Sequence, residues 1–372
     1  MKTKKRKTQP RRKVRLVAEL DTPALLVDLD VLDANIATIA GACARRGVGW
    51  RPHIKGQKVP EIVRREIKAG AIGITCAKLG EAEVMAAAGF GNILIANQIV
   101  GAAKIARLVD LARRVRVIVA VDDAGNVAAL GAAAAAKRVT LRVVIEVDIG
   151  MKRAGVLPGA PALALAKSIA ATRGLCFEGL MAWEAHAVRV ADPAEKKRTV
   201  EEAVGALIAT AEVIRAAGLP VKIVSCGGTG TFPLTLAIRG VTEIQAGGGV
   251  LSDVCYRKHF HIDLPYALKV LATVTSRPNP RRIVCDAGKK SMSGDMALPE
   301  PIGLIGVASV RLSAEHTTVE LDRDDTAIRV GDTIEFIVGY GDTTVHLHEE
   351  LYVVRGGKVI AAWPIAARGK SR

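Results

Sequence analysis

The chain is poor in aromatic residues and cysteine, and it has no long apolar runs. Trp, Tyr and Phe together make up 3% of its 372 residues, too few for a base-stacking platform that binds single-stranded nucleic acid. Its six cysteines are scattered and form no CxxC pair, which excludes a disulfide scaffold and a thiolate zinc cluster. No apolar run reaches the roughly 18 residues of a membrane-spanning helix. We therefore expect a soluble cytoplasmic protein with reduced thiols.

The net charge of +16 is concentrated at the N-terminus. Residues 1–15 contain nine Lys or Arg and no acid, which accounts for more than half of the excess. Such an arm can bind nucleic acid or an anionic membrane surface, but the simpler interpretation is a disordered, solubilising tail, which we place at residues 1–18. No apolar segment of a secretory signal follows it. We expect no membrane partner, and only this tail would favour a nucleic-acid partner.

Short β-branched apolar runs alternate with Ala-rich segments of helical period between residues 24 and 246. Strands of a parallel sheet look like such runs because they are buried on both faces. When the first run, at 25–29, is set aside, eight candidates remain, the number that closes a (β/α)8 barrel. An open, doubly wound sheet is the alternative, but no GxGxxG follows the first strand. The eight candidates begin near residues 50, 72, 92, 115, 141, 176, 222 and 242.

The sequence changes character after about residue 265. The Ala-rich helical patterns stop, and alternating or β-branched segments broken by Gly, Pro and Asp follow. We predict an α/β architecture in which a TIM-like barrel covers residues 19–264 and a mostly antiparallel β domain covers residues 265–372. The run at 24–29 has no place among the eight barrel strands, so it is available to pair into the second domain.

A lysine ends the first predicted barrel strand, which reads RPHIK at residues 51–55. Active sites of parallel barrels lie at the carboxyl ends of the strands. An ammonium group is costly to bury without a partner. Lys55 therefore either extends to water at the barrel mouth or serves as a Schiff-base lysine with a nucleophilic amine.

Two glycine-rich segments follow the seventh and eighth predicted strands, SCGGTGT at 225–231 and AGGG at 246–249. TIM barrels typically bind phosphate in these two loops, and glycine lets backbone N–H groups approach the phosphate oxygens. A lysine on the first strand and a phosphate site on the last two indicate a phosphorylated aldehyde cofactor. Pyridoxal 5'-phosphate is the obvious candidate.

A set of segments resembles the fold-type III pyridoxal-phosphate enzymes, which share an alanine-racemase-like barrel. These segments are DTPALLVDLDVLDANI, RPHIKGQK, AKLGEAE, IEVDIGMKRAGV, SCGGTGTF and TEIQAGGGV. RPHIK and the C-terminal TVHLHEELYVVRGG are similar to one branch, which contains D-threonine aldolase, D-threo-3-hydroxyaspartate aldolase and eukaryotic-type D-serine dehydratase. The resemblance covers residues 20–368. It implies a homodimer in which the β domain of one subunit meets the barrel mouth of the other.

The resemblance also implies roles for individual residues. Lys55 would bind the cofactor covalently, and Arg153 would contact its phenolic oxygen. His186 matches a histidine that transfers the proton of the substrate's β-hydroxyl, a role that suits imidazole at neutral pH. Tyr256 would support the phosphate loop, although Tyr256, Arg153 and His186 each also have a plain structural interpretation. The phosphate would be held by Ser225, Gly227, Gly228, Thr229, Gly247 and Gly248.

The sequence departs from the family at the metal site. Relatives carry His-x-Asp or His-x-Cys there and bind a divalent cation such as Mn, Mg or Zn, whereas the aligned residues here are Tyr340 and Asp342. Tyr is a poor ligand by comparison, so Asp342 either binds a metal without the histidine or has another role. His346 and His348 lie two apart on a predicted strand and would point to one face, as a metal pair or as ordinary packing residues.

Together these residues favour a lyase that cleaves a D-β-hydroxy-α-amino acid, similar to D-threonine, into glycine and an aldehyde by a retro-aldol reaction. Asp342 matches the aldolase form of the motif rather than the Cys form of the dehydratase. The alternative enzymes are a D-serine-type dehydratase, which releases ammonia and a keto acid, and an amino-acid racemase. A cofactor-carrying regulatory protein is the alternative outside enzymes, but such relatives consist of the barrel alone.

Overall fold

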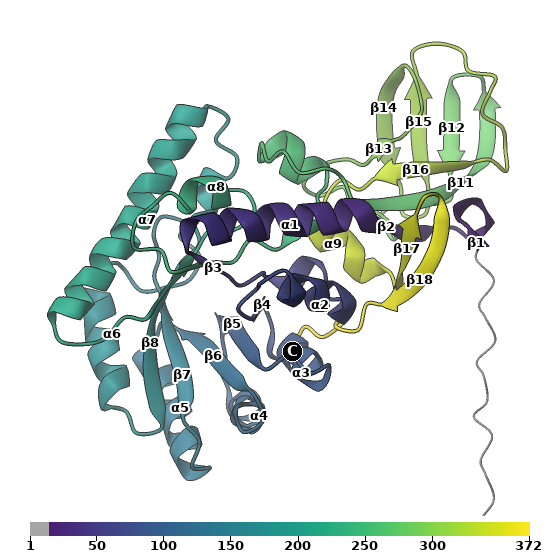
Figure 1. Ribbon diagram of the computed structural model, residues 1–372. Helices are drawn as coiled ribbons and strands as arrows, with labels where there is room; N and C mark the ends of the chain where they lie inside the picture. Colours follow the sequence, from purple (N-terminus) through teal and green to yellow (C-terminus); the bar gives the residue numbers. More distant parts are fainter. Residues whose placement is uncertain (1–14) are drawn as a thin grey trace, which may run out of the picture.

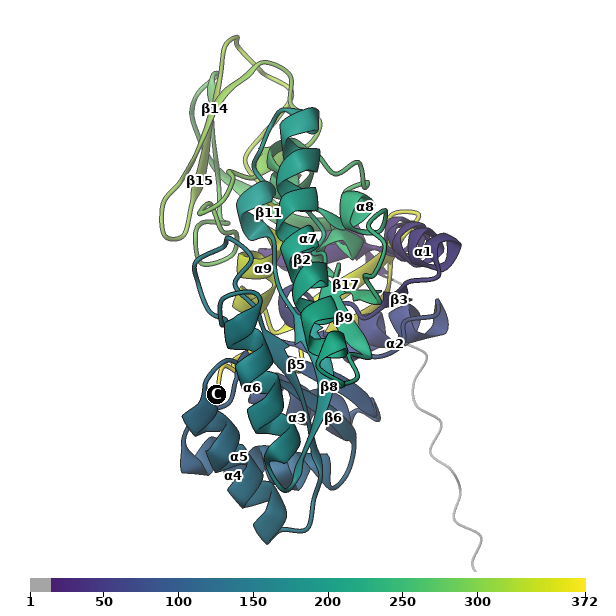
Figure 2. The same ribbon diagram turned by 90° about the vertical axis from the view of Figure 1, so that its left-hand side faces the viewer.

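The computed structural model describes residues 15–372. Residues 1–14, most of the predicted basic tail, lie outside the described part. Within that predicted tail, β1 (Arg15–Leu16) pairs with β18 (Lys358–Pro364), so ordered structure begins before the boundary that we placed at residue 18. The chain forms an eight-stranded parallel sheet and a ten-stranded sheet in which β2 and β17 are the parallel pair (Figures 1 and 2).

All eight predicted barrel strands lie in the first sheet, in the order β3-β10-β9-β8-β7-β6-β5-β4. The edge strands β3 and β4 meet through backbone hydrogen bonds from Ile72 N to Trp50 O and from Thr75 N to Pro52 O, which close the ring. The predicted TIM-like barrel is therefore confirmed. The strands are β3 (Gly49–Trp50), β4 (Ile74–Cys76), β5 (Asn92–Gln98), β6 (Arg116–Val121), β7 (Leu141–Glu146), β8 (Leu175–Met181), β9 (Ile223–Cys226) and β10 (Glu243–Ile244).

Helices connect these strands and cover the outside of the ring (Figure 1). Several begin at an aspartate whose carboxylate accepts hydrogen bonds from the first turn: Asp28, Asp123 and Asp192. Such caps satisfy N–H groups that have no partner within the helix, and so fix where it starts. The helices are α1 (Leu29–Arg46), α2 (Pro60–Lys68), α3 (Leu79–Ala87), α4 (Ala102–Ala112), α5 (Ala124–Ala136), α6 (Ala160–Ala171), α7 (Pro193–Ala216) and α8 (Phe232–Thr235).

Successive side chains on a barrel strand point alternately outward and inward, and they therefore belong to two different apolar clusters. On β5, Ile93 and Ile95 belong to the main core shared with the helices, whereas Leu94 belongs to a smaller cluster inside the ring. That inner cluster is small and contains only residues of the barrel strands. Its members are Leu94, Ile118, Ala120, Val144, Met181 and Ile223.

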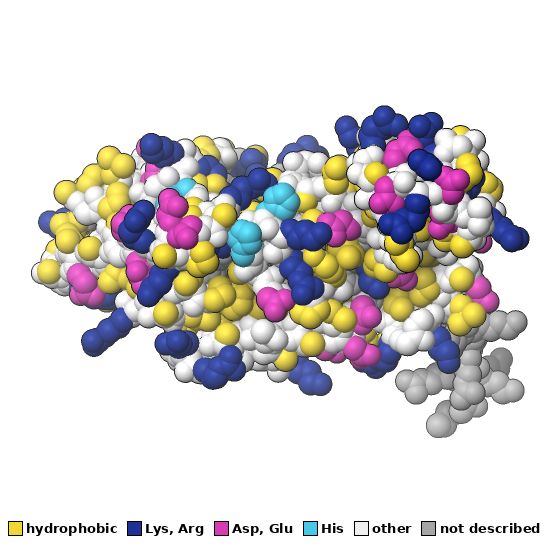
Figure 3. All heavy atoms as spheres, turned by 90° about the horizontal axis from the view of Figure 1, so that it is seen from above, with side chains coloured by type: hydrophobic (Ala, Val, Ile, Leu, Met, Phe, Trp, Pro, Cys, Tyr) yellow, Lys and Arg dark blue, Asp and Glu magenta, His cyan; other side chains and the backbone are white. Residues whose placement is uncertain are grey.

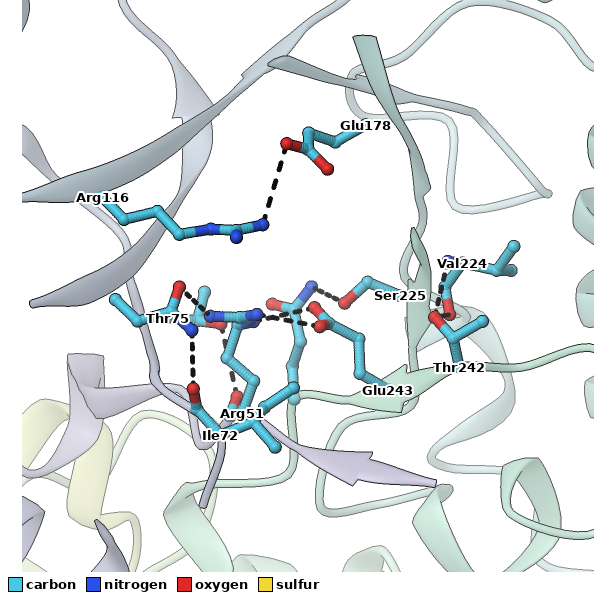
Figure 4. A network of polar contacts seen from close by, with 11 residues as sticks. Arg51, Ile72, Thr75, Arg116, Glu178, Val224, Ser225, Thr242 and Glu243 are labelled. Atoms are coloured by element: carbon cyan, nitrogen blue, oxygen red, sulfur yellow. Dashed lines mark hydrogen bonds and ion pairs between the residues drawn. The ribbon is translucent and has the colours of Figure 1, made fainter. Parts of the chain in front are cut away.

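An ion-pair network lies toward the amino ends of the strands (Figure 4), where Arg51, Glu243 and Glu178 are buried and Arg116 and Arg142 are partly exposed. Arg51 donates through Nε and Nη2 to the two carboxylate oxygens of Glu243, at 2.8 and 3.0 Å. Arg116 and Arg142 both face Glu178, at 3.7 and 3.1 Å. The Arg51 and Glu243 side chains are only 3% and 4% exposed, so each charge depends on its partner to remain buried.

The second sheet contains the C-terminal strands together with β2 (Ala24–Asp28). β2 lies between β17, to which it runs parallel, and β11, to which it runs antiparallel, and it leads directly into α1. The N-terminal run that has no barrel position thus joins the two sheets. The remaining strands are β11 (Leu268–Asn279), β12 (Arg282–Cys285), β13 (Glu300–Pro301), β14 (Val307–Leu312), β15 (Thr317–Leu321), β16 (Thr333–Ile337) and β17 (Glu350–Arg355).

The predicted strand that would hold His346 and His348 is wrong. The chain forms α9 (Gly341–Thr344) and the 3-10 turn η6 (Val345–Leu347) instead, and β17 starts only at Glu350. Asp253 accepts a hydrogen bond from Gly341 N at 2.7 Å, and the Thr344 hydroxyl donates to the Tyr340 carbonyl at 2.8 Å. These bonds turn the backbone into a helix where the residue pattern alone indicated a strand.

The surface carries charges of both signs. On the face in Figure 3, Lys and Arg side chains are interspersed with Asp and Glu, and hydrophobic side chains show between them. No helix in the described part of the chain is long and apolar enough to cross a membrane. All six cysteines lie in this part and are free thiols.

Candidate active site

A cavity of about 650 Å³ lies where the carboxyl ends of the barrel strands face the β domain. Small-molecule sites in proteins typically have volumes of about 300–1,000 Å³. The β domain contributes Met296, Tyr340 and Asp342 to the wall. Of the residues predicted from the sequence, Lys55, Arg153, Gly227, Gly228, Thr229, Gly247, Gly248, Tyr256 and Asp342 line this cavity.

Lys55 lies on a short 3-10 turn, Ile54–Gly56, directly after β3. Its Nζ is 3.0 Å from Asp342 Oδ2, and its side chain is 48% exposed, whereas that of Asp342 is 9% exposed. Although burial alone would raise the pKa of Asp342, the Lys55 ammonium brings that pKa below its usual value. The amine therefore faces a carboxylate that is ionised at neutral pH, and it remains open to a ligand.

His53, two residues before Lys55, is a neutral imidazole. Burial lowers its pKa to about 3, and the nearby Lys55 ammonium contributes to the shift. Its Nδ1 accepts a hydrogen bond of 3.4 Å from Lys55 N, which orients the turn. His53 also lines the cavity, although the sequence gave us no reason to assign it a role.

The Glu184 carboxylate stabilises the first glycine-rich loop through hydrogen bonds. Its carboxylate accepts hydrogen bonds from the hydroxyls of Thr231 and Thr235, both at 2.7 Å, and from Gly227 N at 3.3 Å. Gly227 has a φ of +72°, a conformation that favours glycine. Ser225, predicted as a phosphate contact, does not line the cavity; it is buried and accepts a hydrogen bond from the Gln245 amide.

The two glycine-rich loops are joined to each other, since Gly249 N donates to Thr229 Oγ1 at 2.9 Å. Within the described residues, the N–H groups of Gly228, Thr229, Gly230 and Gly248 have no hydrogen-bond acceptor. All four of these residues line the cavity. Unpaired backbone N–H groups on adjacent loops form a site for an anion such as phosphate.

Glycine is required in these loops because neighbouring groups approach the backbone closely. A Cβ on Gly228 would lie 2.2 Å from the Trp183 ring, and one on Gly248 would lie 2.1 Å from the Tyr256 hydroxyl. Tyr256 therefore packs against the second loop. Trp183, which the sequence analysis did not single out, forms part of the cavity wall.

Two arginines enter the cavity from different elements. Arg153 follows β7, and its Nη2 lies 3.4 Å from Glu146 Oε1. Arg189, which precedes α7, donates hydrogen bonds to Met296, to the carbonyl oxygen at 3.4 Å and to Sδ at 3.6 Å. Arg189 has no carboxylate within ion-pair distance among the residues that the structure describes. The signal for Arg189, a cation shortly after a barrel strand, was present in the sequence but is common on surfaces.

His186 is the predicted site residue that the structure separates from the others. It is exposed on the 3-10 turn Ala185–Ala187, its ring packs against Gly150, and it is not among the residues that line the cavity. The histidine pair is also apart from this site. His346 is exposed, and His348 makes its hydrogen bond to the Ser291 carbonyl at 2.8 Å.

The family model of the alanine racemase N-terminal domain matches residues 27–252, and that of a putative serine dehydratase domain matches residues 267–354. The chain belongs to the alanine racemase-like family. Members of this family are fold-type III pyridoxal-phosphate enzymes. The boundary between the two matches falls where the barrel passes into β11 of the second sheet.

Relatives in this family match nearly the whole chain. A D-threonine aldolase from Arthrobacter sp. is 35% identical over 360 residues, covering 96% of this chain and 95% of the relative. A 3-hydroxy-D-aspartate aldolase from Paracoccus denitrificans is 32% identical, covering 95% and 93%. The crystal structure of D-threonine aldolase from Filomicrobium marinum superposes with a TM-score of 0.94 at 35% identity, covering 98% of this chain and 100% of that chain. The chain is a pyridoxal-phosphate-dependent lyase.

The cavity fits the cofactor of this family. The four unpaired N–H groups on the two loops match the oxygens of a phosphate. The half-exposed Lys55 amine offers a nucleophile for an aldehyde, and Arg153 offers a cation for a phenolic oxygen. All of these groups line one cavity, and the strands that lead to Lys55 and to the two loops, β3, β10 and β9, are neighbours in the ring.

Proposed function

We propose that this enzyme cleaves a D-β-hydroxy-α-amino acid, such as D-threonine, into glycine and an aldehyde by a retro-aldol reaction. The observation that carries the proposal is the 35% identity to a D-threonine aldolase across 96% of the chain. The cavity supports it, because Lys55 and the two phosphate-type loops open into one space. Activity measured with D-threonine and with 3-hydroxy-D-aspartate decides which of the two the enzyme prefers.

In this proposal Lys55 holds the cofactor through Nζ, Arg153 contacts its phenolic oxygen, and the two loops hold its phosphate. Pyridoxal phosphate, when bound, supplies an electron sink for the pair left on Cα as the Cα–Cβ bond breaks. Tyr256 keeps the second loop in place by packing against Gly248. The protein must also bind the substrate carboxylate and accept the β-hydroxyl proton.

Arg189 is the group that we assign to the substrate carboxylate. Lys55 and Arg153 each face a carboxylate of the protein, whereas Arg189 donates its hydrogen bonds to Met296. A guanidinium with free N–H groups binds a carboxylate through paired, charge-assisted hydrogen bonds. Because Met296 belongs to the β domain, this contact also places the substrate at the boundary between the two domains.

Elimination is the second candidate function. Residues 267–354 match the putative serine dehydratase domain, and a D-threo-3-hydroxyaspartate dehydratase from Delftia sp. superposes with a TM-score of 0.84 at 27% identity. A dehydratase would convert D-threonine into ammonia and 2-oxobutyrate instead of glycine and acetaldehyde. Racemisation, the reaction of the more distant alanine racemases, would invert Cα alone and yield L-allo-threonine.

One assay separates these reactions. Purified protein loaded with pyridoxal phosphate is incubated with D-threonine, and glycine, acetaldehyde, ammonia, 2-oxobutyrate and L-allo-threonine are each quantified. We expect glycine and acetaldehyde in equal amounts, and no products from L-threonine as the starting substrate. Ammonia with 2-oxobutyrate would replace the proposal by the dehydratase, and L-allo-threonine alone would replace it by the racemase.

We also propose that two copies of the chain associate. Support comes from apolar side chains exposed on the β-domain segment that follows the cavity residue Met296: Leu298, Ile302, Ile305 and Val307 are 48%, 40%, 74% and 37% exposed. Light scattering after size-exclusion chromatography should report a dimer, and Ile305→Glu should shift it toward the monomer. A monomeric wild type would refute this.

We place the protein in the cytoplasm, a proposal supported by its six free thiols, five of them buried. Thiol titration of protein taken directly from cells, with alkylation before and after reduction, tests this. Equal thiol counts are expected, and cysteines that appear only after reduction would contradict it.

A further inference from the structure

Asp342 lies at the centre of a cluster of hydrogen-bond donors in the cavity wall. Lys55 Nζ is 3.0 Å from its Oδ2, and the Tyr340 hydroxyl donates to the same oxygen at 3.2 Å. The Tyr256 hydroxyl lies 3.5 Å from the other oxygen, Oδ1. The hydrogen bond from Gly341 N to Asp253 fixes the start of α9, on which Asp342 lies. The carboxylate is thus held on both oxygens and from two domains.

These residues do not fit a divalent cation. Where the family resemblance leads one to expect a histidine beside Asp342, this chain has Tyr340. The Tyr340 hydroxyl donates a hydrogen bond to Asp342 at 3.2 Å, and a phenol is a weak ligand for such a cation. Among the residues that the structure describes, no three His, Cys, Asp or Glu side chains come together as a metal site. His346 and His348 do not line the cavity.

Asp342 is also the carboxylate best placed to act on a substrate. The cavity contains two carboxylates, and the other, Glu146, is already bonded by Arg153 and by the Gln98 amide at 2.6 Å. Asp342 faces Lys55, the residue that marks where the reacting carbon must lie. His186, the base suggested by the resemblance, is exposed and outside the cavity lining.

We propose that Asp342, oriented by the Tyr340 and Tyr256 hydroxyls, accepts the β-hydroxyl proton directly, at a position where this chain binds no divalent cation. The inference rests on the proposed retro-aldol function. The proton of the hydroxyl passes to Asp342, the C–O bond becomes the carbonyl of the aldehyde, and the electron pair of the Cα–Cβ bond stays with Cα. Lys55, 3.0 Å from Asp342, can deliver a proton to Cα, so glycine and aldehyde together contain every atom of the substrate.

Metal binding is tested without any assay of turnover. The free Mn²⁺ signal in electron paramagnetic resonance is followed as wild type, Asp342→Asn and Tyr340→His are added, each with and without pyridoxal phosphate. Wild type should leave the signal unchanged, whereas Tyr340→His supplies a nitrogen ligand beside Asp342 and should reduce it. Stoichiometric Mn²⁺ binding by wild type that Asp342→Asn abolishes would overturn the proposal.

Turnover tests the role of the carboxylate. With D-threonine, we expect chelator-treated wild type to retain full kcat, Asp342→Asn to lose at least about 100-fold, and Tyr340→Phe about tenfold with little change in KM. The rival base is tested with His186→Gln, which should lose less than Asp342→Asn. Loss of kcat on chelation, or a larger loss in His186→Gln, would overturn the proposal.

Two controls keep the outcomes separate. The visible absorbance of the lysine-bound cofactor confirms that each variant is folded and loaded, so a loss of kcat is not a loss of cofactor. If wild type cleaves neither D-threonine nor 3-hydroxy-D-aspartate, the proposed function fails, while the Mn²⁺ titration still decides whether the position binds a cation.

Discussion

The two ends of the barrel contain the same kinds of charged side chain in different states. At the amino ends, Arg51 and Glu243 form two hydrogen bonds and are at most 4% exposed. At the carboxyl ends, Lys55 and Arg153 are 48% and 53% exposed, although each faces a carboxylate. In a buried, closed pair, removing one residue leaves the other as an uncompensated buried charge. In an open pair, whose cation is exposed, the cation can exchange its carboxylate partner for a ligand. The comparison separates charges that hold the barrel from charges that serve the site.

Removing the amine at the open end should produce the largest effect. Lys55→Ala deletes the nucleophile that holds the cofactor, so we expect kcat to fall by about 10⁴-fold or more and the visible cofactor absorbance to disappear. Unfolding by denaturant should change little, because the Lys55 side chain is half exposed. Lys78→Ala removes another exposed lysine at the same end of the barrel, outside the cavity lining, and should keep activity. Residual turnover in Lys55→Ala equal to this control would refute the assignment.

A substitution in the buried pair at the amino ends of the strands should lower stability and leave activity unchanged. Glu243→Gln leaves the Arg51 guanidinium buried without an anion, which we expect to cost about 3 kcal/mol in the free energy of unfolding. Activity per folded molecule should be kept. Glu146→Gln makes the same change at the open end, where Arg153 can turn to water, and should cost about 1 kcal/mol or less. Urea denaturation of both variants measures the difference, and equal losses would break the comparison.

Arg189 extends the comparison to a cation at the carboxyl ends of the strands that has no carboxylate partner among the described residues. We expect Arg189→Met to raise KM for D-threonine by at least about tenfold, the value of one charge-assisted hydrogen bond, with a smaller change in kcat. Arg189→Lys should recover part of the loss. Arg198→Met, an exposed arginine on α7 that pairs with Glu202, is the matched control. An unchanged KM in Arg189→Met would mean that another group binds the carboxylate.

The sequence predicted most of the barrel and part of the site, for a physical reason. The strands of a parallel barrel are continuous apolar runs, so their number and order could be counted, and Lys55 and the glycine loops follow strand ends. Arg189, Trp183 and Met296 enter the cavity from irregular segments whose position depends on packing between distant elements. The helical turn at Asp342 likewise depends on the hydrogen bond from Gly341 N to Asp253, 88 positions earlier in the chain. No local pattern encodes such contacts.

A third kind of carboxyl group is buried without any cation, and its effect depends on pH. Burial raises the pKa of Glu66 from 4.5 to about 8, and its hydrogen-bond partner is the Gln57 amide at 2.6 Å. The folded protein therefore keeps this proton between pH 4.5 and 8, where the unfolded chain releases it, so stability is lost as pH rises through that window. For this one group, the loss in the free energy of unfolding has an upper limit of about 1.4 kcal/mol per pH unit.

Glu66→Gln keeps the shape of the protonated side chain and removes the titration. We expect its unfolding free energy, measured with urea at several pH values, to fall less steeply than that of wild type between about pH 5 and pH 8. Glu61→Gln removes a half-exposed carboxylate from the same helix and should leave the wild-type slope unchanged. Parallel curves for wild type and Glu66→Gln would show that Glu66 is ionised in the folded state. Glu66 would then need a buried cation, as Glu243 does, and the distinction between paired and neutral carboxyl groups would fail at this position.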